Sequence, residues 1–129
     1  MIRVEHVYDH KERDGDARFL VDRLWPRGLR KEALEIDGWL QDVAPSARLR
    51  TWFGHDPSKW QELKLRYFKE LDEKPAAWRP LLEAARRGNL VLLEGARDQE
   101  HNQAVALKEY LETKLREAGS SAMGVERLT

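Results

Sequence analysis

The chain contains no cysteine among its 129 residues. A disulfide framework, a thiolate nucleophile and a cysteine-based zinc site are therefore excluded, and packing alone must hold the fold. The absence of cysteine also fits a reducing compartment, so we expect a cytoplasmic protein. With 41% hydrophobic residues, the chain is long enough for one domain with a core and too short for two.

Long hydrophobic runs are absent as well. No stretch approaches the roughly 20 apolar residues that span a bilayer, and residues 1–5 carry charges where a signal peptide needs an apolar run. We therefore expect neither export by that route nor a membrane partner. Lysine and arginine total 23 against 23 acidic residues, so no global positive field draws the chain to nucleic acid. An anion site must be local.

Several familiar sequence motifs are also missing. The chain has no Gly-x-x-x-x-Gly-Lys-Ser/Thr loop, no Gly-x-Gly-x-x-Gly, no Gly-x-Ser-x-Gly elbow and no His-Glu-x-x-His. His6, His55 or His101 with Asp22 or Asp98 would offer metal ligands, but their spacing is not diagnostic. We predict no metal site and no cofactor.

Short apolar segments predict at least three strands. In residues 2–8, Ile2, Val4, His6 and Tyr8 alternate with Arg3, Glu5 and Val7, which suits a short strand that ends near Tyr8. Phe19–Val21 and Leu90–Leu93 are continuous apolar runs, as expected for strands buried on both faces beneath helices. With helices between them, the order predicts the α/β class: a single compact domain with a small, mostly parallel sheet of three or more strands flanked by helices.

Helical signals fill the middle of the chain. Asp37 is expected to cap a short helix that ends before Pro45. Asp56-Pro57 combines an N-cap with proline at the first helical position, and an apolar stripe at helical spacing follows it. A further stripe ends at Gly88, a natural C-terminal stop.

The two ends of the domain follow from similar signals. Residues 9–16 form a charged loop closed by Gly15, and Asp98 is a candidate N-cap for a last helix. We expect the domain to span residues 1–118 and residues 119–129 to form a flexible C-terminal tail.

The segments that follow the predicted strands are unusually polar. In open α/β sheets, ligands bind beyond the carboxyl ends of the strands, and in a parallel sheet those ends converge. The polar residues at these exits are Tyr8 after the first strand, Asp22, Arg23, Trp25 and Arg27 after the second, and Arg97, Asp98, His101 and Asn102 after the third.

Two arginines on a proline-stiffened loop suit an anionic ligand. Arg23 and Arg27 carry planar, permanently charged groups that match a carboxylate or a phosphate, and the N-terminus of a helix capped by Asp98 would add a positive dipole end. Structural interpretations stand beside this one. Asp22 and Arg23 would equally form structural ion pairs, and Asp98 would serve only as a cap.

A second group of candidate residues lies between two predicted helices, where long loops carry function. Ser46, Arg50, Trp52 and His55 belong to it, and His55 is a candidate for proton transfer. In the structural alternative, Ser46 caps a helical turn and His55 merely precedes the Asp56 cap.

Three motifs in order identify a known family: Val21–Gly28; Ala44-Pro45-Ser46 followed by Leu49, Arg50, Trp52, Phe53 and His55; and Ala96-Arg97-Asp98 with His101-Asn102. With these motifs the chain resembles the YeaO-like family, domain of unknown function 488, from about Ile2 to about Leu115. Glu94-Gly95 departs from the pattern, where a more apolar or aromatic pair is expected. The resemblance implies a compact bacterial-type cytosolic α/β protein and carries no established activity, substrate or cofactor.

Our leading hypothesis is a site for an anionic small molecule that bears a phosphate or a carboxylate, at the carboxyl ends of the strands. Whether the chain is an enzyme stays open. The candidate acid-base residues are Asp22, His55, Asp98 and His101, and the candidate ligand-binding residues are Tyr8, Arg23, Trp25, Arg27, Ser46, Arg50, Trp52, Arg97 and Asn102.

The alternative hypothesis is a non-catalytic interaction module. In that case Trp25, Trp52 and the arginines would present a surface to a protein or a nucleic acid. Nucleic acid is the weaker partner because the chain has no net charge. The sequence leaves the oligomeric state open.

Overall fold

The computed structural model of the chain describes residues 1–9 and 15–128, and the side chains of residues 1–9 and 15–118. In this part of the chain four strands form one parallel sheet with the order β1-β4-β2-β3. The strands are β1 (Ile2–His6), β2 (Ala17–Leu20), β3 (Gly38–Trp39) and β4 (Leu90–Glu94). The predicted α/β class and the single compact domain are confirmed.

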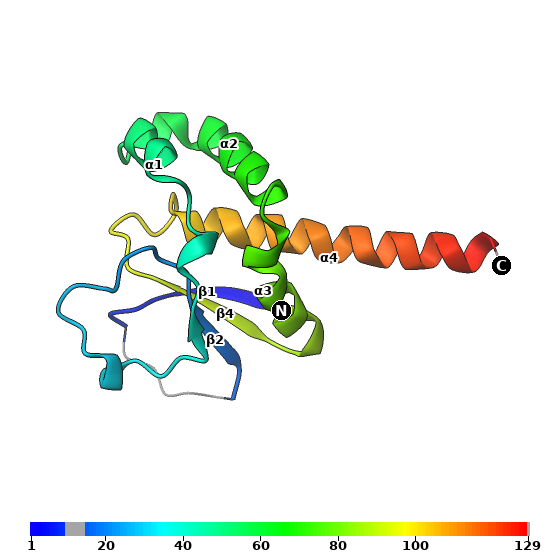
Figure 1. The fold of residues 1–129 in the computed structure, drawn as a ribbon, viewed down its shortest axis with the longest axis horizontal. Coiled ribbons are helices and arrows are strands. Elements are labelled where there is room, and N and C mark those ends of the chain that lie inside the picture. The colour runs from blue at the N-terminus through cyan, green and yellow to red at the C-terminus, as the bar shows by residue number, and fades with distance from the viewer. Residues whose placement is uncertain (10–14, 129) are drawn as a thin grey trace.

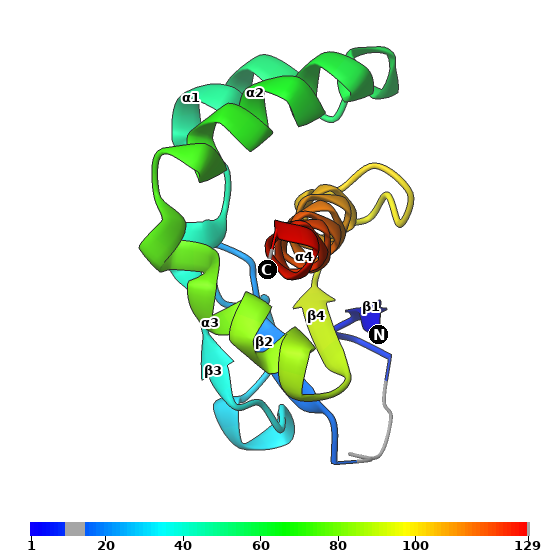
Figure 2. The same cartoon turned by 90° about the vertical axis from the view of Figure 1, so that its right-hand side faces the viewer.

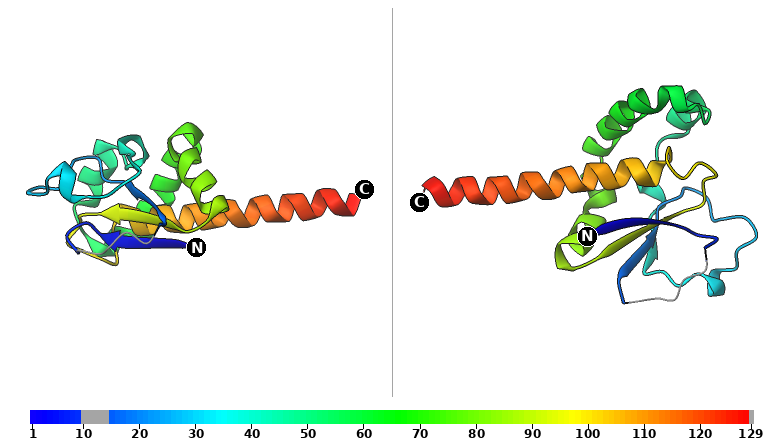
Figure 3. Two further views of the ribbon diagram at one scale, coloured as in Figure 1. Left: turned by 90° about the horizontal axis from the view of Figure 1, so that it is seen from below. Right: turned by 180° about the vertical axis from the view of Figure 1, so that it is seen from behind.

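Four α-helices accompany the sheet: α1 (Ala47–Phe53), α2 (Trp60–Asp72), α3 (Pro75–Arg87) and α4 (Gln103–Leu128). α4 contacts β1 and β4, and α3 packs against β4 and α4. Figure 2 looks along α4 and shows this helix above the sheet. α1 and α2 lie on the side of α4 that faces away from the sheet. The C-terminal part of α4 extends beyond the other elements (Figures 1 and 3).

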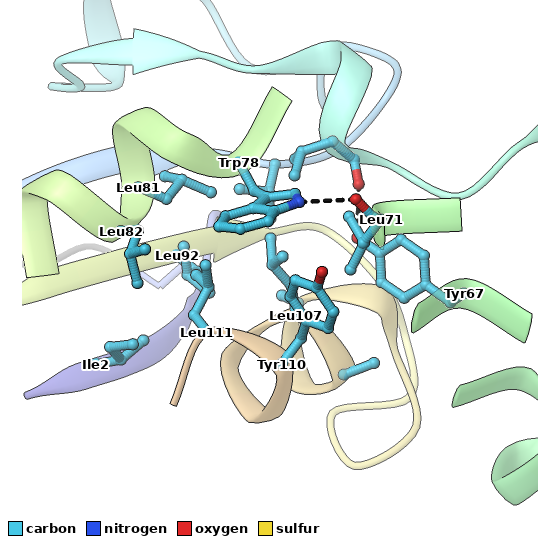
Figure 4. Close-up of a cluster of buried hydrophobic side chains, with 14 of the residues drawn as sticks. Ile2, Tyr67, Leu71, Trp78, Leu81, Leu82, Leu92, Leu107, Tyr110 and Leu111 are labelled. Carbon is cyan, nitrogen blue, oxygen red and sulfur yellow. Dashed lines mark hydrogen bonds between the residues drawn. The ribbon is translucent and has the colours of Figure 1, made fainter. Parts of the chain in front are cut away.

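The main core lies between the helices and one face of the sheet. Leu90 and Leu92 project into it from β4, while Val91 and Leu93 belong to a second cluster on the opposite face, as the alternation of a strand requires. In the core the indole Nε1 of Trp78 donates to the carbonyl of Leu71 at 2.8 Å (Figure 4). The Trp78 ring therefore adds apolar contact area without leaving its N–H unpaired.

A loop covers the second face of the sheet. Partly buried side chains from the segment between β2 and β3, together with Trp39, pack against Leu20, Val91 and Leu93. Trp25 meets Trp39 edge to face with ring centroids 5.4 Å apart. The expectation of helices over both faces is therefore wrong, because aromatic and aliphatic side chains of an irregular segment bury this face instead.

The helix predicted after Asp37 is replaced by a short strand and a turn. β3 pairs in parallel with β2, and the amide of Leu40 continues this pairing by donating to the carbonyl of Leu20 at 2.9 Å. A single 3-10 turn, Gln41–Val43, follows. Asp37 accepts a hydrogen bond from the amide of Arg18 at 2.8 Å, so it ties the start of β3 to β2 instead of capping a helix.

The other boundaries lie close to the predicted ones. β1 ends at His6, two residues before Tyr8, and α3 ends at Arg87 just before Gly88. Pro57 is the first residue of a 3-10 turn, Pro57–Lys59, that leads into α2. Asp56 caps this turn. Of the predicted loop at residues 9–16, residues 10–14 lie outside the described part of the chain.

The last helix begins later than expected and has a different cap. The buried Asn102 side chain accepts hydrogen bonds from the amides of Ala104 at 3.0 Å and Val105 at 3.1 Å, which is the contact of an N-cap. Asp98 closes the turn before it, so the assignment of Asp98 as the helix cap is wrong. The backbone of α4 is helical to Leu128, and the tail predicted at residues 119–129 stays a prediction.

Candidate functional site

A pocket of about 300 Å³ lies at the carboxyl ends of β2 and β4. The segments before α1 and α4 and parts of α1 and α2 complete its wall. Its lining residues are Asp22, Arg23, Leu24, Ala44, Pro45, Arg50, Phe53, His55, Leu63, Gly95, Ala96, Asp98, His101, Asn102 and Gln103. The pocket occupies the place where ligands bind in open α/β sheets, and its volume is at the lower end of the usual range for such sites.

About half of the candidate residues meet in this pocket. Those that line it are Asp22, Arg23, Arg50, His55, Asp98, His101 and Asn102. Those that do not are Tyr8, Trp25, Arg27, Ser46, Trp52 and Arg97. Residues from three separate motifs of the sequence thus form one concavity, because β2 and β4 are adjacent in the sheet and α1 lies next to their ends.

Asp22 connects the exits of the two strands. Its carboxylate accepts a hydrogen bond from the amide of Gly95 at 2.8 Å and a second one from the side-chain amide of Gln103. Burial, helped by the nearby negative charge of Glu94, raises the pKa of Asp22 to about 6, although the hydrogen bonds from Gly95 and Gln103 act to lower it. Asp22 therefore holds the β2 exit against the β4 exit and the start of α4.

Glu94 and His6 lie beside Asp22 and were not among the predicted site residues. The Glu94 side chain is 0% exposed, accepts from the amide of Ala96 at 2.6 Å, and lies 3.3 Å from the Nδ1 atom of His6. Burial raises the pKa of Glu94. The sequence did offer a signal for Glu94. This charged residue directly follows four apolar residues, and the Glu94-Gly95 pair departs from the family pattern.

Asp98 and His101 form a pair on the other wall. The Nδ1 atom of His101 lies 2.9 Å from the Asp98 carboxylate, which also accepts from the amides of Glu100 and His101. These contacts, the Glu100 amide first, lower the pKa of Asp98. With Nδ1 donating to Asp98, Nε2 is the ring nitrogen that can accept a proton. The His101 ring also packs edge to face on Trp60 at 5.4 Å.

Two arginines bring positive charge to the pocket from different elements. Arg23 follows β2, where the Trp39 indole fixes the backbone by donating to the carbonyl of Asp22 at 2.7 Å. Arg50 lies in the last turn of α1. Neither guanidinium forms an ion pair with a side chain in residues 1–9 or 15–118. Both therefore remain able to bind an anion.

Ser46 supports the pocket from outside. Its hydroxyl accepts from the amide of Leu49 at 3.2 Å, and Ser46 donates to the two carboxylate oxygens of Glu70 through its amide at 2.9 Å and its hydroxyl at 2.6 Å. These bonds fix the N-terminus of α1 to α2 and thereby set the position of Arg50 one turn later. This confirms the structural alternative for Ser46 as a helix cap.

His55 stands at the rim in a strained conformation. Gly54 and His55 both have positive φ angles, 55° and 58°, and His55 is the non-glycine residue with this feature in the described part of the chain. Positive φ is uncommon for residues with a Cβ atom, although histidine adopts it more readily than most. These two backbone conformations turn the chain sharply between α1 and the Asp56 cap. The His55 side chain is exposed and lines the pocket.

The remaining aromatic candidates are occupied elsewhere. The Trp52 ring lies under the Arg66 guanidinium at 4.2 Å and the Lys59 ammonium at 5.1 Å. Trp25 donates its indole N–H to the carbonyl of Leu29. The Tyr8 hydroxyl donates to the carbonyl of Arg27 at 2.8 Å, which ties the loop after β2 to the end of β1.

In residues 1–9 and 15–118, no cluster of three or more histidine, aspartate or glutamate side chains is arranged to bind a metal ion. In the same described part of the chain, no helix has the length and apolar character needed to cross a bilayer.

Comparison with known proteins places these motifs in a family. A family model described as the inactive DUF488-N3 subclade matches residues 1–125. The uncharacterised protein YeaO of Escherichia coli strain K12 is 34% identical over 110 residues, which cover 85% of this chain and 96% of YeaO. Uncharacterised proteins of Mycobacterium tuberculosis and Mycobacterium bovis are 43% identical over 75 residues. The match covers 58% of this chain and 64% of each mycobacterial protein, less than two thirds of their length. No solved structure matches the chain.

Proposed function

The chain belongs to the YeaO-like DUF488 family, and from this premise we propose that it binds a small phosphate- or carboxylate-bearing molecule in the strand-end pocket without catalysing a reaction on it. One observation carries the proposal. Arg23 and Arg50 border the same pocket from different elements, and neither is neutralised by a described acidic side chain.

Two arginines suit this task better than lysines would. Each guanidinium presents a planar set of N–H donors that binds two oxygens of one carboxylate or phosphate at once. Because Arg23 follows a strand and Arg50 belongs to a helix, the anion would be held between two fixed backbones. The amide groups of Gly95 and Ala96 do not take part, since Asp22 and Glu94 already accept from them.

The absence of catalysis rests on two observations. The matching family model is described as an inactive subclade. In addition, no serine, threonine, cysteine, lysine or tyrosine stands among the described residues that line the pocket, which leaves only aspartate and histidine as side chains for a covalent or acid-base step. The Asp98–His101 pair then orders the loop before α4, and Asp22 joins the two strand exits.

Thermal stabilisation by inorganic phosphate tests the binding. We expect phosphate to raise the melting temperature of the protein in a concentration-dependent way, because a ligand that binds only the folded state stabilises it by mass action. Arg23→Ala and Arg50→Ala are expected to weaken this effect at least ten-fold in apparent Kd. Arg48→Ala is the matched control, since Arg48 is exposed on the same helix as Arg50 and does not line the pocket.

The outcomes separate clearly. Equal loss of phosphate binding in Arg48→Ala and Arg50→Ala would mean that phosphate senses only general surface charge, and the proposed site would be wrong. Hydrolysis of a phosphate monoester by the wild type that Arg50→Ala abolishes would overturn the non-catalytic part of the proposal and leave the binding site intact.

The alternative of an aromatic interaction surface has weaker support. It requires Trp25 and Trp52 to be available to a partner, whereas cations cover one of these rings and the other packs on Trp39. A concave pocket with unpaired arginines favours a small molecule instead.

A further inference from the structure

The pocket has an apolar wall that a bare anion would not use. Ala44, Pro45, Phe53 and Leu63 line it on the side of α1 and α2, and carbon atoms make up most of its surface. Ala44, Phe53 and Leu63 are 4–8% exposed, so an inorganic phosphate bound by the two arginines would leave the pocket-facing atoms of this wall in contact with water. The pocket also has room for more than an anionic group, because 300 Å³ is the space of about ten water molecules.

Leu24 adds another apolar side chain to the lining of the pocket. It directly follows Arg23 and lines the pocket, yet it is 72% exposed. A single exposed leucine is ordinary on a protein surface. Here, however, the exposed leucine lines a concave site that Phe53 and Leu63 also line, and it directly follows Arg23, which we propose to bind the anion. A ligand with an apolar part would cover Leu24 at the same time as its anion meets Arg23.

Resting on the proposed function, we infer that the ligand is an organic anion in which a phosphate or carboxylate is joined to an apolar ring or chain. The anionic group lies between Arg23 and Arg50, and the apolar body lies against Leu24, Phe53 and Leu63. An inorganic anion lacks the second part. A sugar phosphate places hydroxyl groups against carbon, where they lose hydrogen bonds to water without replacement.

Titration calorimetry with four small probes tests this inference. The probes are inorganic phosphate, phenyl phosphate, ribose 5-phosphate and benzoate. Phenyl phosphate is expected to bind about ten-fold or more tightly than inorganic phosphate and ribose 5-phosphate, since burial of a ring contributes at least that factor. Benzoate distinguishes the carboxylate from the phosphate form of the ligand by its affinity relative to phenyl phosphate.

A pair of leucine variants isolates the apolar wall. Leu24→Ser is expected to weaken phenyl phosphate about five-fold, through the loss of apolar contact at an exposed position that does not hold the fold. Leu65→Ser is the control, because Leu65 is 64% exposed on α2 and does not line the pocket. Its affinity for phenyl phosphate should equal that of the wild type.

The results distinguish this inference from the proposed function. If inorganic phosphate binds with the same affinity as phenyl phosphate and Leu24→Ser changes neither, the anion site stands and the apolar body is wrong. Tighter binding of ribose 5-phosphate than of phenyl phosphate would also overturn the inference. If none of the four probes binds, the proposed function itself fails.

Discussion

Asp22 shows how one side chain joins the strand exits and what that contact costs. The carboxylate is partly buried beside Glu94, and its pKa of about 6 lies above the value near 3.9 of an unfolded chain. Below about pH 4, Asp22 is protonated in both states and contributes no pH dependence. Between about pH 4 and 6 the unfolded state ionises first, so the folded state loses stability as the pH rises.

Asp22→Asn should remove this pH dependence. Asparagine keeps an oxygen for the amide of Gly95, and Gln103 can turn its own side-chain oxygen toward the new NH₂ group. We expect Asp22→Asn to gain up to about 3 kcal/mol relative to the wild type between pH 4 and pH 7, from a shift of about two pKa units. Urea denaturation at four pH values across this range measures the difference.

Asp98→Asn provides a control of opposite sign. The pKa of Asp98 is lowered, so its charge contributes stability that is present above the unfolded pKa and lost as the pH falls. Both variants should match the stability of the wild type at low pH. Near neutrality, Asp98→Asn should be less stable than the wild type, whereas Asp22→Asn should be more stable. Parallel curves for wild type and Asp22→Asn would contradict the assigned role of Asp22.

At the scale of elements, the sequence predicted what periodicity and turn chemistry encode. The apolar run at Leu90–Leu93 predicted β4, and the stripe that ends before Gly88 predicted α3. β3 was missed because two residues, Gly38–Trp39, are too short to show a period, and their strand conformation comes from pairing with β2. Local propensity at Asp37 favoured a helix, and tertiary pairing decided against it.

The candidate site was predictable where it follows a strand and was not where it depends on contacts across the fold. Asp22 and Arg23 come directly after one apolar run and Asp98 lies in the segment that follows another, so their convergence followed from a parallel sheet. The burial of Glu94 depends on His6 from another strand and on the amide of Ala96. Trp52 looked available in the sequence, but Arg66 from α2 covers its ring, a contact that no local pattern specifies.

The start of α4 depends on Asn102, and its removal should be measurable. Asn102 is 3% exposed, and its oxygen binds two otherwise unpaired amides of the first turn. Asn102→Ala should reduce the unfolding free energy by about 1–2 kcal/mol. Asn102→Ser retains a hydroxyl able to cap the helix and should lose less. Urea denaturation of the two variants compares them, and an equal loss would mean that packing rather than capping explains the role of Asn102.

At the scale of the whole molecule, the two faces of the sheet are covered by different kinds of structure. Helices bury the face that carries Leu90 and Leu92, and an irregular loop buries the face that carries Val91 and Leu93. The same loop begins with Asp22, Arg23 and Leu24, so the pocket wall continues into the cover of the second face. A ligand bound at Arg23 would therefore contact the same loop that buries the second face, and it would stabilise the folded state by mass action.

The length of the folded domain can be tested by truncation of α4. Leu111 is a fully buried residue of this helix, Leu115 packs partly against the core, and beyond these the helix axis leaves the rest of the molecule (Figure 1). A chain that ends at Ala118 should unfold within about 1 kcal/mol of the full chain, because terminal segments that extend beyond the rest of the fold contribute little to stability. A chain that ends at Tyr110 should lose several kcal/mol, since deletion of buried leucines costs about 2–5 kcal/mol each. Urea denaturation of the three lengths decides the matter: a large loss already at Ala118 would place residues 119–129 within the cooperative unit and move the domain boundary past the one expected from the sequence.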